Sequence, residues 1–177
     1  MKRLPGDPSA ERQIARMIRV DHAGEYGAKR IYEGQLAVLG ARSGTAKKIR
    51  RMAEQEQQHL DAFEKLVIER RVRPTALSPL WHAAGFALGA ATALLGERAA
   101  MACTVAVEEV IDEHYQRQID ALGDDEPALK KSLEEFRGHE IEHRDTARES
   151  GGDDAPLLLS AAIKAGSKLA IWLSTRI

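Results

Sequence analysis

The chain has 177 residues, of which 44% are hydrophobic and 30% are charged, a balance typical of a globular protein rather than a disordered one. Its 26 basic and 27 acidic residues leave a formal net charge of −1, which argues against a nucleic-acid partner. The single cysteine, Cys103, excludes an internal disulfide and any site built from several cysteines. This length predicts one domain spanning residues 1–177.

The amino-terminal stretch, MKRLPGDPSAER, has early basic residues but no apolar segment behind them. It also carries Asp7 and Glu11, and acidic residues are rare in mitochondrial transit peptides. We therefore expect neither an export signal nor an import signal in this stretch.

Helical periodicity, interrupted by glycine and proline, predicts an all-α protein of six helices. In chain order the expected helices cover residues 9–39, 46–70, 80–96, 97–122, 127–150 and 157–175, with turns at GARSGT, RRVRPTALSP, GDDEP and GGDDAP. Long helices with short connections are typical of a bundle.

Two of these segments are unusually apolar. Residues 74–96 carry no formal charge, but only about 17 of them are expected to be helical, which is the lower limit for a membrane span. Residues 157–175 have a wide apolar face and a narrow polar stripe made of Ser160, Lys164, Ser167, Lys168 and Ser174. This pattern is typical of an amphipathic helix at a membrane surface. We expect both segments to face a membrane; burial against the bundle or a partner subunit is the alternative.

Three arginines, Arg70, Arg71 and Arg73, stand just before the first apolar segment. Basic residues beside a membrane-facing segment attract anionic lipid head groups. We expect these three side chains to do so here.

Two of the expected helices carry the motif Glu-x-x-His, which brings both side chains to one face of a helix. The motifs are Glu56–His59 in the second helix and Glu140–His143 in the fifth. One such motif is weak evidence because helices are rich in glutamate. Two of them in matching hairpins indicate a metal site.

Each motif follows a helix that offers one more inward glutamate. Glu25 precedes Glu56 by 31 residues. Before Glu140, strict spacing favours Glu109, whereas the apolar residues that share a face favour Glu108. These positions lie roughly 18–22 Å from their turns, at about 1.5 Å per residue, so packing of the hairpins would bring them to one level.

Four carboxylates and two imidazoles at one level of a dry core would repel one another and raise each other's pKa unless cations were bound. Mixed carboxylate and imidazole ligands suit iron or manganese. A glutamate from each of two helices, with Glu-x-x-His from each of two others, is the ligand pattern of di-iron bundles. We therefore expect a ferritin-like four-helix bundle with two additional apolar or amphipathic helices.

Other interpretations of the same residues stay open. The string His139-Glu140-Ile-Glu-His143 is also the H-E-x-x-H motif of zinc proteases, although that role leaves the first hairpin unexplained. A ferritin-like or rubrerythrin-like iron oxidase or peroxidase would use the same ligands, and a helical interaction module would use none. The histidines His22, His82, His114 and His139 are expected on solvated helix faces, and Cys103 is expected to be buried. Tyr26 and Tyr115 lie near ligand positions, where packing, substrate positioning and electron transfer are the alternatives.

From about Ile14 to Ile177 the sequence resembles the demethoxyubiquinone hydroxylase family. The strings that carry the resemblance are VDHAGEYGAKRIYEGQ, EQEQQHLDAFEKL, CTVAVEEVIDEHYQRQI, HEIEHRD and the late AIWLS. The resemblance implies a membrane-associated di-iron monooxygenase that uses O₂ to hydroxylate the ring of a polyprenylated demethoxyubiquinone or demethoxyubiquinol in ubiquinone biosynthesis. It places the iron ligands at Glu25, Glu56, His59, Glu108, Glu140 and His143, and so selects Glu108 over Glu109.

The same resemblance implies two iron ions per chain, with NADH as a candidate reductant. It also implies a substrate whose isoprenoid tail stays in lipid while the ring reaches the bundle core. Because the import sequence of eukaryotic members is missing, we expect a peripheral protein at the cytoplasmic face of a bacterial inner membrane. A homo-oligomer or a complex with other ubiquinone-biosynthesis proteins is the expected assembly.

Overall fold

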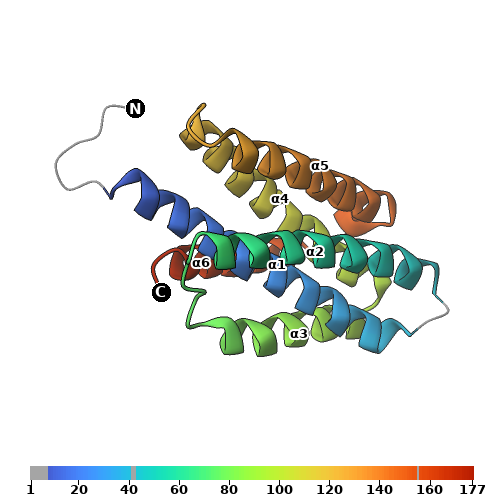
Figure 1. Ribbon diagram of the computed structural model, residues 1–177. Coiled ribbons are helices and arrows are strands. Elements are labelled where there is room, and N and C mark those ends of the chain that lie inside the picture. Colours follow the sequence, from blue (N-terminus) through green and yellow to red (C-terminus); the bar gives the residue numbers. More distant parts are fainter. Residues whose placement is uncertain (1–7, 41–42, 155) are drawn as a thin grey trace.

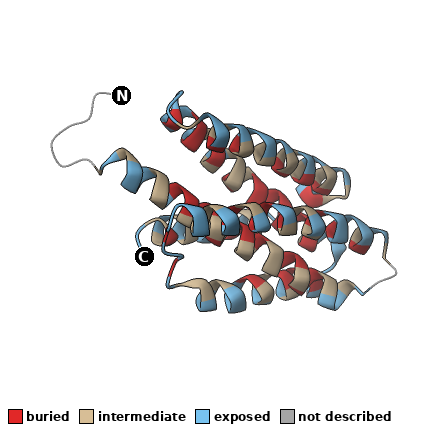
Figure 2. Cartoon of the chain, in the orientation of Figure 1, coloured by how far each residue is buried: buried red, intermediate tan, exposed pale blue. Residues whose placement is uncertain are grey.

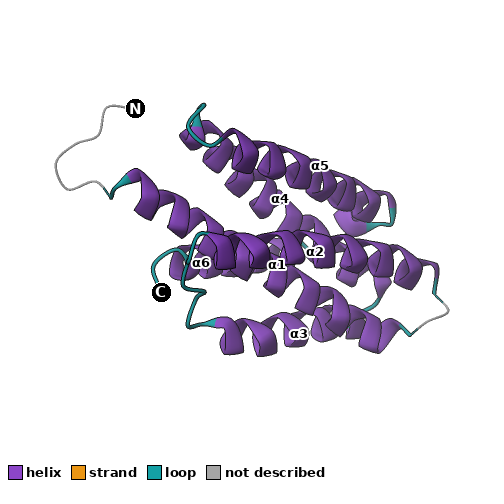
Figure 3. Ribbon diagram, viewed as in Figure 1, coloured by secondary structure: helices purple, strands orange, loops and turns teal. Residues whose placement is uncertain are grey.

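The structure is a computed structural model that describes residues 8–40, 43–154 and 156–177. These residues form six α-helices and a short 3₁₀ turn and contain no strand, so the expected all-α class is confirmed (Figure 3). The elements are α1 (Ala10–Leu39), α2 (Gly44–Glu69), α3 (Ser78–Leu94), α4 (Glu97–Leu122), α5 (Pro127–Glu149), η1 (Gly152–Asp154) and α6 (Leu157–Ser174).

Two long hairpins form the central bundle. α1 packs against α2, and α4 packs against α5, and the two pairs face each other (Figure 1). α3 then lies along α1, and α6 lies along α4, so the bundle carries two additional helices. This is the expected ferritin-like arrangement of four helices plus two.

Helix ends differ from the expected ones by at most two residues. α2 begins at Gly44 rather than at residue 46, because Ser43 caps it by accepting a hydrogen bond from the amide of Ala46. α3 begins at Ser78 with Pro79 in its first turn, where a missing N–H costs no hydrogen bond. It ends at Leu94, and Gly96 (φ +112°) turns the chain into α4.

Some expectations fall on residues that the structure does not describe. The expectation that the amino-terminal stretch carries no targeting signal rests largely on residues 1–7, which are not described. Parts of two expected turns, at residues 41–42 and at residue 155, are not described either.

The apolar core is divided by a polar layer. One cluster, at one end of the hairpins, contains Met17, Phe63, Tyr115, Ile119, Leu122, Leu129 and Leu133. The second, at the other end, contains Tyr32, Ile49, Met52, Met101, Val105 and Ala147. On every one of the four helices, the Glu and His positions lie between these two clusters, and Figure 2 colours the buried residues red along these helices.

Close backbone contact holds α3 against α1. A Cβ atom at Gly89 would overlap the carbonyl oxygen of Ile31, and one at Gly85 would lie 2.9 Å from the carbonyl oxygen of Gly27. Only glycine allows two helices to approach so closely. The glycines of α3 therefore pack one of its faces and leave Leu80 and Leu94 exposed.

The polar stripe of α6 faces the bundle. Lys164 pairs with Glu109 of α4, and Lys168 lies 3.3 Å from Glu113. The opposite, apolar face is open, with Leu158 85% and Leu169 55% exposed, and Leu157 at the start of the helix is 88% exposed. α6 also meets the length and hydropathy of a membrane span, with only 11% of its residues buried, although length and composition alone are weak evidence of spanning.

One of the three arginines before α3 has a partner within the protein. The Arg70 side chain is 44% exposed and pairs with Glu126, just before α5, at 2.8 Å. Contact of the three arginines with anionic lipid stays a prediction.

Candidate metal centre

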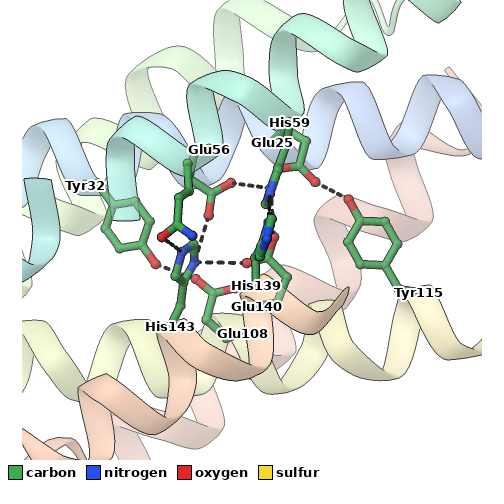
Figure 4. A network of polar contacts seen from close by, with 10 residues as sticks. Glu25, Tyr32, Glu56, His59, Glu108, Tyr115, His139, Glu140 and His143 are labelled. Atoms are coloured by element: carbon green, nitrogen blue, oxygen red, sulfur yellow. Dashed lines mark hydrogen bonds and ion pairs between the residues drawn. The ribbon is translucent and has the colours of Figure 1, made fainter. Parts of the chain in front are cut away.

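The six candidate ligands converge in the polar layer between the two hairpins (Figure 4). α1 and α4 each supply one glutamate, and α2 and α5 each supply a glutamate and a histidine, because residues three apart share a helix face. All six are at most 3% exposed: Glu25, Glu56, His59, Glu108, Glu140 and His143.

These side chains form two overlapping groups of potential metal ligands. One group combines Glu25, Glu56, His59 and Glu140, and the other combines Glu56, Glu108, Glu140 and His143; within each, the ligand atoms lie within 4.8 Å of one another. Glu56 and Glu140 belong to both groups. Such an arrangement suits two ions bridged by two carboxylates.

Both histidines present Nδ1 to the carboxylates. His59 Nδ1 lies 3.2 Å from Glu25 Oε2 and 3.1 Å from Glu140 Oε1. His143 Nδ1 lies 3.2 Å from Glu56 Oε1 and 3.2 Å from Glu140 Oε2. Nδ1 is therefore the nitrogen available to an ion.

The outer nitrogens of the histidines are held crosswise. His143 Nε2 lies 3.0 Å from Gln55 Oε1, and His59 Nε2 lies 2.9 Å from His139 Nδ1. Gln55 and His139 each stand directly before the glutamate of a motif, so each hairpin supports the histidine of the other. A partner on the outer nitrogen fixes the tautomer and orientation of a metal-binding imidazole.

Two tyrosines hold the remaining glutamates in the same crosswise manner. Tyr32 donates a hydrogen bond to Glu108 Oε1 at 2.5 Å, and Tyr115 donates one to Glu25. Tyr32 follows Glu25 by seven residues, and Tyr115 follows Glu108 by seven. The site therefore has an approximate two-fold symmetry that is already present in the sequence.

Burial and mutual repulsion set the protonation of the carboxylates. Burial, with the charge of Glu140, raises the pKa of Glu56 and Glu108 well above the usual range. Burial alone would also raise the pKa of Glu140, but His143 and His59 lower it to about 2. Burial alone would lower the pKa of His59, but the nearby carboxylates of Glu140 and Glu25 raise it to about 10. Without cations, protons must supply the compensating charge.

Several ligand atoms have no hydrogen-bond partner among the described residues. They are both carboxylate oxygens of Glu56 and of Glu140, Glu108 Oε2 and His143 Nδ1. An unsatisfied buried polar atom costs about 1–3 kcal/mol, so a cluster of them requires a bound partner. Divalent cations fit these atoms, and mixed oxygen and nitrogen donors suit iron or manganese.

The structure distinguishes Glu108 from its neighbour. Glu108 points into the polar layer, whereas Glu109 turns outward to Arg148, at 2.5 Å, and to Lys164. His139 belongs to neither group of ligands. In a zinc protease both histidines of H-E-x-x-H bind the metal. Here His139 contacts the outer nitrogen of His59 instead, and only His143 belongs to the candidate ligands.

Three of the four remaining histidines do not have the solvated positions expected for them. His139 is half-buried against His59, His22 is half-buried, and His114 lies against the carboxylate of Asp21 at 3.0 Å. Only His82 is exposed, and its Nδ1 lies 2.5 Å from the hydroxyl of Tyr26. Tyr26 therefore faces α3 rather than the polar layer, unlike Tyr115.

Sequence reasoning missed the partners of the ligands and one buried acid. Gln55 and Tyr32 were detectable from the repeated spacing, since their counterparts in the other hairpin are His139 and Tyr115. Asp21 is 3% exposed and lies one helical turn before Glu25. Its position on the face of Glu25 was the available signal.

Comparison with known proteins agrees with this geometry. Residues 12–174 match the family described as ubiquinone biosynthesis protein COQ7. The chain is 61% identical to a 3-demethoxyubiquinol 3-hydroxylase of Rhodospirillum rubrum, over 99% of this chain and 84% of that protein. It is 50% identical to the human mitochondrial NADPH-dependent 3-demethoxyubiquinone 3-hydroxylase, over 93% of this chain and 78% of the human protein. It is 40% identical to the mitochondrial 5-demethoxyubiquinone hydroxylase of Saccharomyces cerevisiae, over 93% of this chain and 78% of the yeast protein.

Proposed function

The chain belongs to the COQ7 family of ubiquinone biosynthesis proteins, and on this basis we propose that it is a di-iron monooxygenase that hydroxylates the ring of polyprenylated demethoxyubiquinol or demethoxyubiquinone. The observation that carries the proposal is the buried set of four carboxylates and two imidazoles with unsatisfied ligand atoms. A hydroxylase of this class converts RH, O₂, two electrons and two protons into ROH and water.

The six residues divide naturally between two ions. Glu25 and His59 would hold one ion, and Glu108 and His143 the other. Glu56 and Glu140, which belong to both groups, would be shared by the two ions. Two bound irons supply the redox chemistry that activates O₂.

The chain itself supplies orientation and dryness. The crosswise contacts from Gln55 and His139 fix the two imidazoles, and those from Tyr32 and Tyr115 fix the two outer carboxylates. Apolar clusters at both ends of the polar layer exclude water from the reacting centre. Fixed ligands in a dry core reduce side reactions of activated oxygen with water.

The exposed apolar faces of α3 and α6 support a membrane-bound substrate. We propose that residues 1–177 form one domain in which α3 and α6 lie on the membrane surface, at the cytoplasmic face of a bacterial inner membrane. The isoprenoid tail would stay in lipid while the ring enters the bundle. The apolar surface outside the lipid contact would accept a second copy of the chain or another ubiquinone-biosynthesis protein.

The reductant belongs to the nicotinamide class. The human relative is named as NADPH-dependent, whereas the sequence led us to expect NADH. Both dinucleotides therefore need to be compared in the assay.

The function is tested by loading the purified protein with iron and supplying a short-chain demethoxyubiquinol, O₂ and either dinucleotide. We expect two irons per chain and a product that carries one oxygen atom from ¹⁸O₂. Glu56→Gln should lose iron and product, whereas Glu54→Gln, an exposed neighbour on α2, should retain both. Iron oxidation or peroxide removal without hydroxylated product would instead support the ferritin-like or rubrerythrin-like alternative, and one zinc without iron would contradict both.

A further inference from the structure

The approximate symmetry of the site is broken at one end. The residue four before the outer glutamate is Asp21 on α1 but Thr104 on α4, and the residue six after it is His114 on α4 but Ile31 on α1. The Thr104 hydroxyl is satisfied by the backbone of its own helix. One end of the site is therefore lined by a carboxylic acid and an imidazole, and the other by an alcohol and a hydrocarbon.

The acid is deeply buried and held in place from α4. Asp21 Oδ1 lies 3.0 Å from His114 Nε2 and accepts a hydrogen bond from Gln118 Nε2 at 2.8 Å. Its side chain is 0% exposed, and its second oxygen, Oδ2, has no hydrogen-bond partner among the described residues. Burial raises the pKa of Asp21, although the contact with His114 opposes that shift. A buried carboxylate oxygen without a partner needs either a proton or a hydrogen-bond donor such as water.

The imidazole connects this acid to the outside. The His114 side chain is 13% exposed, and with Gln118 it lines a surface cavity of about 290 Å³. That cavity is large enough for several water molecules. The cavity, His114 and Asp21 thus form a polar path from solvent into the bundle.

The path ends beside the metal centre. Asp21 and Glu25 lie one turn apart on the same face of α1. The charged or titratable groups that act on Asp21 or line the outer cavity are Glu25, His114, Tyr115, Arg16 and Arg117. Among these, His114 alone both contacts Asp21 and reaches the cavity.

We propose that His114 and Asp21 are proton-transfer residues that carry the two protons of each hydroxylation from the surface cavity to the Glu25 end of the metal centre. The inference rests on the proposed function, in which O₂, two electrons from the nicotinamide reductant and two protons yield the hydroxylated ring and one water. A core sealed by apolar clusters has to receive these protons along a polar path. The other end of the site, with Thr104 and Ile31, has no corresponding acid and imidazole.

The first test replaces the acid without changing its shape. In Asp21→Asn the oxygen that accepts from Gln118 remains, but the group can no longer exchange a proton. We expect two irons per chain as in the wild type, hydroxylation slower by about 100-fold, and a larger solvent deuterium isotope effect. Asp21→Glu should recover part of the rate, and Asp120→Asn, an exposed residue of α4, should behave as the wild type.

The second test uses the cavity. His114→Ala should slow hydroxylation, and added imidazole should restore it because the cavity gives access to the vacated position. Infrared difference spectra of iron-loaded wild type against Asp21→Asn should show the carboxyl band of Asp21 and its deuterium shift, a readout that does not depend on turnover.

The outcomes separate the two proposals. If the wild type forms no hydroxylated product, the proposed function fails. If the wild type forms product and Asp21→Asn matches it in rate and isotope effect, the proton path is overturned. It is also overturned if Asp21→Asn or His114→Ala loses iron, or if His114→Ala fails to respond to imidazole, since the two residues would then be structural.

Discussion

At the residue scale, the orientation of the histidine ligands depends on two residues at matching positions. Gln55 and His139 precede the two motif glutamates and contact the outer nitrogens of His143 and His59. One partner is an amide and the other an imidazole, yet both offer an acceptor to the N–H of the ligand. The requirement is therefore for an acceptor at this position rather than for a particular residue.

Removing that acceptor should weaken metal binding. We expect His139→Ala to lower the affinity for iron about 10–100-fold, because His59 loses the contact that orients it. Competition with a chelator measures this change. His139→Gln, which copies the residue of the other hairpin, should remain close to the wild type, as should His82→Ala at an exposed site. Unchanged affinity in His139→Ala would show that His59 needs no such support.

At the element scale, the position of α3 depends on glycine. Gly89→Ala would force its Cβ against the backbone of Ile31, and backbone cannot move aside as a side chain can. We expect a loss of about 1–3 kcal/mol in the free energy of unfolding, measured by urea denaturation. Gly166→Ala on α6 has open space around its Cβ and should instead be neutral or stabilising by up to about 1 kcal/mol. Equal effects of the two changes would contradict the close contact between α1 and α3.

The docking of α6 on α4 should depend on pH through Glu109. Burial alone would raise the pKa of Glu109, but Lys164 and Arg148 lower it below its usual value. A carboxylate with a lowered pKa in the folded protein stabilises it above its usual pKa, and this contribution disappears as the pH falls through the lowered value.

The corresponding experiment compares Glu109→Gln with the wild type across pH. The variant should be less stable at neutral pH by up to about 1 kcal/mol, since the pair is partly exposed. The difference should shrink as the pH falls below the usual glutamate pKa of about 4.3 and vanish below the lowered value. Glu54→Gln, at an exposed position on α2, should show a smaller difference. A difference that grows toward acid would have the wrong sign for this pair.

At the scale of the whole molecule, the exposed apolar faces predict membrane binding. We expect the wild type to float with vesicles that contain anionic lipid, whereas the double substitution Leu157→Ser and Leu158→Ser should reduce binding at least tenfold, since each leucine contributes about 1.5–3 kcal/mol on burial. Ile68→Ser removes an equally exposed apolar residue, at 76%, from the end of α2 and should not affect flotation. Equal losses of vesicle binding in both variants would indicate non-specific hydrophobic binding rather than binding through α6.

Removal of metal should lower the stability of the whole bundle. The polar layer joins all four bundle helices, and without cations its carboxylates must share protons or repel one another. At an iron concentration 100-fold above the dissociation constant, binding adds about 2.7 kcal/mol, which calorimetry would detect as a higher melting temperature. A metal-free protein that melts at the same temperature would argue against ion binding in the buried layer.

The sequence by itself determined the helices, the class of fold and five of the six candidate ligand positions, and the family resemblance selected the sixth. Helix periodicity and glycine or proline breaks are local signals, so the ends of the helices were predictable to within two residues. The five positions were predictable because a repeated motif with equal spacing constrains positions on helix faces. Their convergence in the structure agrees with that prediction, while their binding of iron stays a proposal.

Tertiary structure alone decided which side chains meet across the hairpins. Spacing allowed both Glu108 and Glu109, and only the packing of α4 against α1, α5 and α6 turned one inward and paired the other with Arg148 and Lys164. The same packing made His139 the support of His59 and buried Asp21 against His114. Periodicity specifies the face of one helix, whereas a contact depends on the rotation and depth of two helices together, and these are set by the whole core.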